Sequence, residues 1–453
     1  MAYRSPGVRI EDLPNQALAA QPGGVRIPAV VGTGATTTLV PNVPLTKGTA
    51  DGTDTIVNPL NTTVLEVTAI SDVPGLSQYK QGTDFTIINN NIVWAPAGSE
   101  PSTGATYYVS YTKAKPSSSY NTPDLWFSLK DVRDAFGPEL KNGIVNPITN
   151  AAAMAFRNGA ASVMIVQATT GSNTDLQTAI DALQLSDIDV IVAPQATNST
   201  LQNYLKTHVI TQSAPSIKHE RMAVMAPTLD GLSPSISEQT GRADGMADRR
   251  IVLVSPPAVI LTLKDSATNQ DTDVLVSSGY AAAGFAGLMT NANFDPAEPL
   301  TRKSVSGLKT LSNFNYLPSQ MDVLAARGIT VLESINDAIR VRHALTTGTG
   351  NINDLTVSVV LIIDNIRKDV RSALEREFIG TKILASTPSA VATKIKALLD
   401  TKVNDKIIVD YDEGSIAVTQ DLTDPRTLKV SFAVAPVYPL EFIDVVFSLF
   451  VAA

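Results

Sequence analysis

Between residues 149 and 254 the chain alternates short apolar runs with amphipathic stretches, and this alternation limits its possible folds more than any other feature. The apolar runs are short and rich in Val and Ile, which favours strands buried on both faces. The intervening stretches carry apolar residues at helical spacing. The pattern predicts a largely parallel sheet covered by helices. The expected helices span about 149–158, 175–185 and 200–210, with strands at 162–166, 190–194, 222–225 and 250–254.

A different pattern occupies residues 58–111, where short strands alternate with clusters of Pro, Gly and Asn. Many short strands between turns are typical of a small β-sandwich or barrel. A Thr-rich stretch over 36–53 precedes this module and a Lys-Pro-Ser linker at 115–119 follows it. The module is therefore predicted to be an inserted domain, either a decorative outer domain or a receptor-binding one.

The C-terminal part begins with a long helix that has one apolar stripe. The stripe comprises Val359, Ile362, Ile363, Ile366, Val370, Ala373 and Leu374. Arg367, Lys368 and Arg371 lie off it, on a face that is either solvated or in contact with a partner. Thr387 is expected to cap a second helix that has Pro388 at its first position. Strands are expected to follow at 407–411, 416–419 and 428–434, with a turn at Glu413-Gly414.

Both ends of the chain have the pattern of extended arms. Near the start, Val8 and Ile10 alternate with charged residues, which is the period of a half-buried strand. The last predicted strand, residues 442–451, is apolar on both faces, with Ile443, Val445 and Phe447 on one side. Such a strand is expected between two neighbouring strands rather than at a sheet edge.

Composition excludes several classes of protein. The length of 453 residues suggests about three domains at roughly 150 residues each. The net charge of −8 has the wrong sign for a protein that grips nucleic acid. With no cysteine, disulfides, thiolate zinc sites and cysteine nucleophiles are excluded. The sequence has no apolar stretch of the roughly 18 residues that cross a bilayer, so a soluble protein is expected.

Charged residues make up only 17% of the chain, against roughly 25% in an average domain. Such sparse charge is explained either by a surface that other chains cover or by a surface rich in Ser, Thr and Asn.

Motifs that carry chemistry are absent from the sequence. Gly32-Thr33-Gly34 lacks the third glycine of a dinucleotide loop, and the three histidines have no metal-ligand spacing. No G-x-S-x-G elbow occurs near Ser277-Ser278 or elsewhere. We therefore expect no catalytic, cofactor-binding or metal-binding residues and no cofactor. A dispersed Ser/His/Asp triad, and with it a hydrolase or nucleotide-using enzyme on the α/β segment, stays the alternative.

Taken in order, several motifs resemble those of contractile tail sheath proteins of bacteriophages and related phage-tail-like particles. The arm at 3–13 is similar to the family's Pro-Gly-Val opening, and 155–166 resembles its helix, Asn-Gly corner and strand. The resemblance continues in the serine-glycine and alanine-rich segment 277–284, in the segment 305–311 and at 326–331, where Thr330 replaces the family's asparagine. It ends in the Pro-x-x-Pro-x-Glu-Phe closing strand at 436–442.

The resemblance implies a mechanical function. In the family, terminal arms add strands to sheets of neighbouring subunits and knit helical rings around an inner tube. Val8, Ile10, Ile443, Val445 and Phe447 would then pack inside sheets shared between chains. The alternative is that both arms pair within their own subunit. Contraction, triggered at the baseplate, drives the tube through a bacterial envelope for genome delivery without using a nucleotide.

The resemblance also implies partners and a location. Partners would be further copies in a helical homo-oligomer, the tail tube protein, and baseplate and tail terminator proteins, with no direct nucleic acid contact and no membrane insertion. The tube-facing candidates are Arg367, Lys368 and Arg371. The protein would be part of a virion tail assembled in the host bacterial cytoplasm. A static tube or capsid subunit is the remaining competitor, although a tube subunit should be shorter and mostly β.

The expected fold class is α/β and α+β multidomain. Residues 1–44 form the N-terminal arm and first core strand, and 45–117 form the inserted β-domain. Residues 118–345 form the α/β middle domain, and 346–453 form a C-terminal α+β domain with its own arm, completed by the N-terminal arm.

Overall fold

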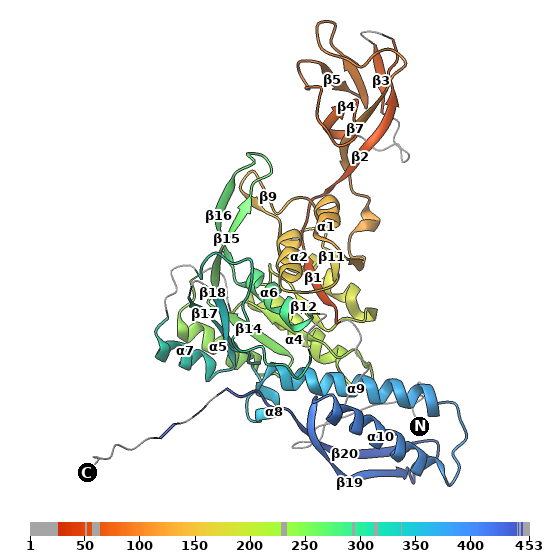
Figure 1. Cartoon of the computed structure of the whole chain (residues 1–453), viewed down its shortest axis with the longest axis vertical. Coiled ribbons are helices and arrows are strands. Elements are labelled where there is room, and N and C mark those ends of the chain that lie inside the picture. Colours follow the sequence, from red (N-terminus) through yellow and green to blue (C-terminus); the bar gives the residue numbers. More distant parts are fainter. Residues whose placement is uncertain are drawn as a thin grey trace, which may run out of the picture.

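The computed structural model describes residues 26–49, 52–56, 64–227, 233–291, 295–311, 316–336, 338–441, 443 and 445–446. A small β-domain, a central α/β domain and a C-terminal α+β domain follow one another along the long axis of the molecule (Figure 1). The expectation of a mixed α/β chain with several sheets is confirmed.

An eight-stranded sheet forms the centre of the α/β domain. Its inner strands run parallel, and the strand at each edge is antiparallel to its neighbour. The predicted alternation is thus confirmed, because buried parallel strands appear in the sequence as continuous apolar runs. The strands, in spatial order, are β18 (Ala338–His343), β17 (Ile329–Ile335), β14 (Ile251–Ser255), β13 (Met222–Met225), β12 (Val190–Val192), β1 (Pro28–Gly32), β11 (Val163–Gln167) and β8 (Asp124–Trp126).

Helices cover both faces of this sheet. One face packs against α2 (Pro147–Arg157) and α6 (Gly279–Met289), near α1 (Leu129–Phe136). The other packs against α3 (Asn173–Asp181), the 3-10 turn η2 (Ala182–Leu185), α4 (Ser199–Gln212), α5 (Ile236–Met246) and α7 (Pro318–Ala325). Several of these helices begin at a side-chain cap, as at Asn146, Ser172 and Asn198, which fixes the residue where each helix starts.

Two hairpins and the β-domain project from the central sheet (Figure 1). The hairpins are β9–β10 (Leu140–Lys141, Ile144–Val145) and β15–β16 (Ala258–Lys264, Asp271–Ser277). The β-domain has two three-stranded sheets. One contains β2 (Thr37–Thr46), β7 (Thr106–Ala114) and β4 (Val64–Ser71), and the other β3 (Thr53–Thr55), β6 (Asn91–Trp94) and β5 (Phe85–Ile88). Their apolar faces meet around Trp94, Tyr107 and Tyr111.

The β-domain starts earlier in the chain than the predicted boundary. Its first strand begins at Thr37, inside the range assigned to the N-terminal arm. The first part of the Thr-rich stretch that suggested a boundary, residues 37–46, is itself a strand, since Thr is β-branched and suits a half-exposed sheet. A short 3-10 turn, η1 (Ser117–Ser119), follows the last strand.

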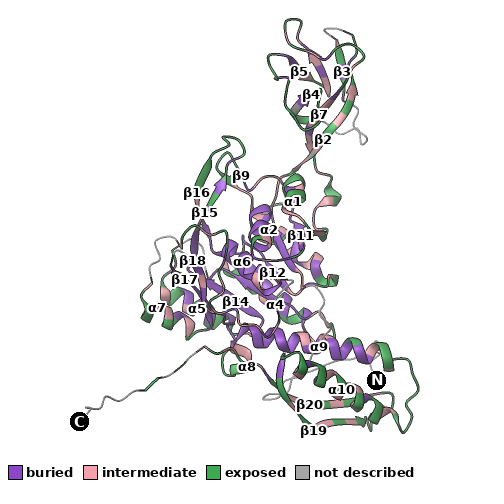
Figure 2. Cartoon of the chain, in the orientation of Figure 1, coloured by how far each residue is buried: buried purple, intermediate pink, exposed green. Residues whose placement is uncertain are grey.

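In the C-terminal domain the helices α9 (Val357–Phe378) and α10 (Thr387–Asn404) pack on the hairpin formed by β19 (Ile408–Gln420) and β20 (Leu428–Pro436). A short helix, α8 (Ile352–Leu355), precedes α9. The predicted stripe of α9 is buried along its whole length (Figure 2). The cap predicted at Thr387 is wrong, because α10 includes Thr387 and begins after Ser386.

The turn predicted at Glu413-Gly414 is wrong as well, because β19 is one continuous strand there. The pairing register with β20 shifts between Asp412 and Ala417, so the extra residues form a bulge. Ser415 holds the bulge: its hydroxyl donates to the Asp412 carbonyl over 2.6 Å and accepts the amide of Ala433 over 2.7 Å. A bulge and a turn use the same residue types, which explains the wrong prediction.

Candidate functional site

The β19–β20 hairpin has two open edges. Among the described residues no further strand pairs with either of its outer edges. One face is fastened to α9 and α10 through Phe432, which is 4% exposed, and through partly buried neighbours such as Tyr411 and Val430. A twisted hairpin held on a rigid base, with free N–H and C=O groups along both edges, is a template for added strands.

A segment with exposed apolar side chains follows β20 directly. After Pro436 the chain passes α8 and leaves the body of the molecule (Figure 1). Leu440 is 76% exposed, Ile443 74%, Val445 76% and Val446 97%. None of these residues belongs to a strand of its own chain. Exposed apolar residues along an extended chain are typical of a surface that another molecule covers.

The predicted arm residues are only partly described. Ile443 and Val445 lie on the segment just described, with both side chains exposed. Phe447, Val8 and Ile10 lie outside the described residues. Packing of these five side chains between subunits therefore stays a prediction.

The solvated face predicted for Arg367, Lys368 and Arg371 is wrong. Arg367 is 4% exposed and Arg371 8%, and Arg371 forms a buried ion pair with Glu220. Lys368 contacts Asp189 over 2.6 Å and Asp187 over 3.6 Å. Burial alone would lower the pKa of Lys368, but the two carboxylates outweigh it and raise that pKa. Lys368 and Arg371 thus join α9 to the α/β domain, whereas Arg367 lies 3.8 Å from Asp364 of α9 itself.

The parallel sheet explains why the cations of α9 are buried. Parallel strands begin at one common edge, and charged residues lie within two positions of the start of three of them: Asp189 before β12, Glu220 before β13 and Arg250 before β14. Helix α9 runs along this edge, so its cations meet carboxylates there. The signal was present in the sequence as acidic residues, Asp189 and Glu220, one and two positions before buried strands.

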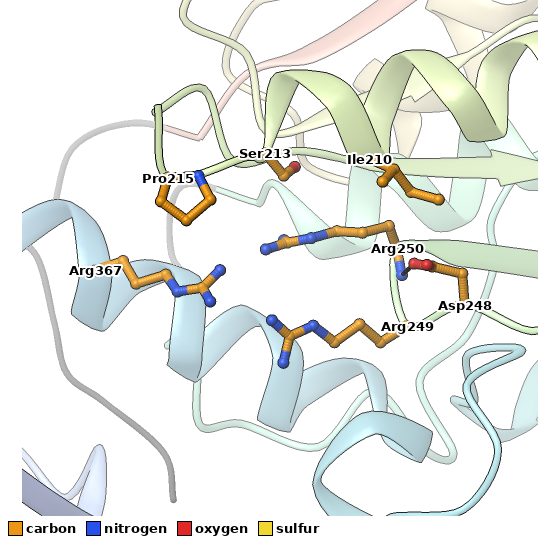
Figure 3. Close-up of a pocket in the computed structure, with 7 residues that line it drawn as sticks. All are labelled: Ile210, Ser213, Pro215, Asp248, Arg249, Arg250 and Arg367. Carbon is orange, nitrogen blue, oxygen red and sulfur yellow. Dashed lines mark hydrogen bonds between the residues drawn. The ribbon is translucent and has the colours of Figure 1, made fainter. Parts of the chain in front are cut away.

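A partly open pocket of about 330 Å³ lies at this joint. Figure 3 shows the guanidinium groups of Arg249, Arg250 and Arg367 facing it, beneath the end of α4 with Ile210 and Ser213. The positive charges have acidic neighbours. Arg249 lies 3.2 Å from Asp354, while the buried carboxylate of Asp364 pairs with Arg250 and lies 3.8 Å from Arg367. The matched charges fit a domain joint better than an anion-binding site.

Burial raises the pKa of Asp364, but Arg250 and Arg367 outweigh burial and lower it, so this carboxylate stays ionised in the joint. Within the residues that the structure covers, no three His, Cys, Asp or Glu side chains gather in a way that would hold a metal ion. The described helices include none that combines the length and the apolarity needed to cross a membrane.

Family models match two regions of the chain. Residues 354–450, which contain α9, α10 and the hairpin, match the phage tail sheath C-terminal domain. Residues 25–130, which include the β-domain, match a domain of unknown function (DUF4815).

Two phage proteins are similar in sequence. The tail sheath protein of Bacillus phage SP01 is 35% identical over 127 residues, covering 27% of this chain and 21% of that protein. A putative tail sheath protein of Enterococcus phage phiEF24C is 23% identical over 222 residues, covering 48% of this chain and 37% of that protein. The chain thus matches well under two thirds of the length of either relative.

Solved structures match over nearly the whole chain. The helical sheath of the anti-feeding prophage in its contracted state gives a TM-score of 0.60 at 13% identity, with 99% of each chain covered. The contracted sheath of an extracellular contractile injection system gives 0.56 at 15% identity, covering 100% of this chain and 99% of that one. A sheath tail protein from Desulfitobacterium hafniense gives 0.51 at 12% identity, covering 96% and 97%.

These likenesses confirm the resemblance read from the sequence. The fold is that of sheath proteins over nearly all of the chain, and the domain bearing the open hairpin is the part that matches a sheath family model. The chain therefore has the fold of contractile sheath proteins, and its C-terminal part matches the phage tail sheath C-terminal domain.

Proposed function

We propose that this chain is the repeating subunit of a contractile sheath, which polymerises helically around an inner tail tube and shortens to drive that tube through a bacterial envelope. The observation that carries the proposal is that one domain contains both a hairpin with two open edges among the described residues and an extended apolar segment outside the body. Donor and acceptor of a strand exchange are thus present on every copy.

Strand addition would link the copies. An arm of one subunit lies along an edge of the β19–β20 hairpin of a neighbour, where backbone hydrogen bonds supply affinity and alternate side chains supply register. The two open edges provide one place for a C-terminal arm with Ile443, Val445 and Phe447, and one for an N-terminal arm with Val8 and Ile10. Each subunit would then be tied to neighbours on two sides.

Contraction would draw its energy from interfaces that form only in the shorter helix. The subunit bodies move while the arms stay paired and act as tethers. A nucleotide is not required for such a release. The sparse charge of the chain, 17% of its residues, suits a surface that is largely covered by other copies.

The proposal extends to partners and location. The sheath would contact the tail tube, the baseplate and the tail terminator in a virion tail assembled in the host cytoplasm. Contact of Arg367, Lys368 and Arg371 with the tube stays a prediction, and the ion pairs of Lys368 and Arg371 with the α/β domain do not support it.

The first test is negative-stain electron microscopy of the purified chain and of a variant truncated after Glu441. We expect hollow, ridged tubes from the full chain, and folded monomers without tubes from the truncated one. A peptide spanning residues 437–453 should bind the truncated variant, because its hairpin edge is left open. Only globular particles from the full chain, over a range of salt and protein concentration, would contradict the proposal.

A cross-linking experiment can identify which edge of the β19–β20 hairpin pairs with the C-terminal arm of a neighbouring copy. Because the chain has no cysteine, Val445→Cys can be combined with Thr419→Cys on β19 or with Ser431→Cys on β20. Oxidation of assembled tubes should link neighbouring copies in one combination and not in the other. Equal linking in both, or linking in dilute monomers, argues against addition of the tail at a defined edge.

A further inference from the structure

Glu441 is the point where the C-terminal segment is fastened to the body. Its carboxylate oxygen Oε2 lies 2.8 Å from Nε2 of His343, and its Oε1 accepts a hydrogen bond from the Thr301 hydroxyl over 3.3 Å. The side chains of Glu441 and His343 are 13% and 16% exposed. In the part of the chain that the structure describes, Glu441 is the last residue whose side chain bonds to the α/β domain.

The groups that hold Glu441 belong to a rigid edge. His343 ends β18, the outermost strand of the eight-stranded sheet. Thr301 precedes a stretch that pairs along the same strand: the amide of Arg302 donates to the Val341 carbonyl over 2.6 Å, and the amide of Val305 donates to the Ile339 carbonyl over 2.9 Å. The Glu441 carboxylate is therefore bound at the edge of the eight-stranded sheet.

A second contact lies just before this one. The Tyr438 hydroxyl hydrogen-bonds the Asn353 side chain on α8, so the segment is held at two points between the hairpin and the sheet. Beyond Glu441, the described residues Ile443 and Val445 are 74% and 76% exposed.

We infer that Glu441 is a positioning residue: by binding His343 and Thr301 it fixes where, and in which direction, the C-terminal arm leaves the subunit. The inference rests on the proposed strand exchange. Binding of Glu441 to the sheet shortens the stretch of chain that moves freely before the arm. A shorter free stretch raises the effective concentration of the arm at the hairpin within its reach and lowers it at other hairpins. Glu441 would thus select which neighbour the arm joins, while the apolar residues after it supply the affinity.

The test uses Glu441→Ala, with Glu441→Gln and His343→Ala as partial losses of the same contact. The matched control is Glu333→Gln on the neighbouring strand β17. This variant removes a carboxylate that lies 3.1 Å from Arg342 and leaves the contacts of the C-terminal segment intact. Spin labels at Ile443→Cys and at the exposed Ser334→Cys report the distance from the arm to the sheet in monomers, since the chain has no other cysteine.

We expect one narrow distance distribution in the parent chain and in Glu333→Gln, and a broad one in Glu441→Ala. Protease cleavage after the hairpin should become roughly tenfold faster, as expected for loss of one charge-assisted contact. Tubes of Glu441→Ala should be shorter or irregular, with Glu441→Gln intermediate because Gln still accepts from Thr301.

Two results would overturn the inference. An unchanged distance distribution in Glu441→Ala would show that Glu441 does not hold the C-terminal segment. Tubes of unchanged length and helical order would show that Glu441 does not position the arm for assembly. Failure of the parent chain to form tubes contradicts the proposed function instead, and the spin-label distances then decide by themselves whether Glu441 anchors the segment.

Discussion

Asp54 holds the core of the β-domain together with a single carboxylate. It accepts hydrogen bonds from the Trp94 indole and the Tyr107 hydroxyl, each over 2.9 Å, and from the Gly48 amide over 2.8 Å. Burial, followed by this carboxylate, raises the pKa of Tyr107, so the hydroxyl stays a donor. Because Asp54→Ala leaves two buried donors, the Trp94 indole and the Tyr107 hydroxyl, without an acceptor, we expect the β-domain to lose about 3 kcal/mol of stability.

Urea denaturation followed by Trp94 fluorescence measures this loss. The only other tryptophan, Trp126, is replaced by Phe in all samples. Asp54→Asn should fall between parent and Ala, since it keeps one acceptor oxygen. A midpoint for Asp54→Ala equal to that of the parent would show that the two buried donors find other partners.

Gly287 permits the close approach of α6 to α2. A Cβ built on it would lie 2.4 Å from the Ala155 carbonyl oxygen, a backbone atom that cannot move aside. Gly287→Ala should therefore lower the melting temperature of the α/β domain by several degrees. Gly241→Ala on α5 is the control, because nothing lies within 4 Å of its Cβ and alanine favours the helix by roughly 0.5–1 kcal/mol. Equal melting temperatures for the two variants would contradict the packing argument.

At the scale of elements, α9 and α10 are joined by a buried pair whose charge depends on pH. Asp369 lies 3.1 Å from Lys402, and the Asp369 Oδ1 atom has no hydrogen-bond partner among the described residues. Burial raises the pKa of Asp369 to about 6, against an opposing effect of Lys402. The folded chain therefore binds this proton more tightly than the unfolded chain, whose Asp has a pKa near 3.8.

The sign of the pH dependence follows from this difference. Between about pH 4 and pH 6 the native state binds more protons, so this group's contribution to the free energy of unfolding falls as the pH rises and is constant above about pH 7. Asp369→Asn cannot titrate. We expect the melting temperature of the parent, relative to that variant, to rise when the pH is lowered from 7 to 4. A difference that is flat over this range would place the pKa of Asp369 back near its ordinary value.

For the whole molecule, the spacing of apolar side chains along the C-terminal arm predicts which substitutions block assembly. Ile443 and Val445 lie two residues apart and share one face of an extended chain. Ile443→Asp combined with Val445→Asp should abolish tubes, because two carboxylates would be buried in a sheet between subunits. The monomer should stay as stable as the parent, since both side chains are exposed there.

The control for this experiment is Ile144→Asp. Ile144 is 74% exposed, as Ile443 is, but it stands on the β9–β10 hairpin of the α/β domain. Electron microscopy should show tubes for this variant. Loss of tubes in Ile144→Asp as well would indicate that exposed apolar residues in general, rather than tail pairing, drive assembly.

Much of the α/β sheet was predictable from the sequence, because strands such as β12 and β13 are buried on both faces and therefore continuously apolar. The stripe of α9 was predictable for a similar reason. The burial of Arg371 was not, since periodicity along one helix says nothing about Glu220 across the joint. The anchor at Glu441 was equally hidden, because His343 and Thr301 are distant in sequence.

The strand ends that join the β-domain to the rest of the molecule lie side by side. Thr37 pairs with Ala114, and the Lys115 amide donates to the Thr36 carbonyl over 2.9 Å, so the chain enters and leaves this domain through one narrow neck. A domain attached in this way can be exchanged for another without altering the sheet beneath it. Different cargo could be displayed at regular intervals along a helical polymer by replacing residues 37–114 and keeping the neck.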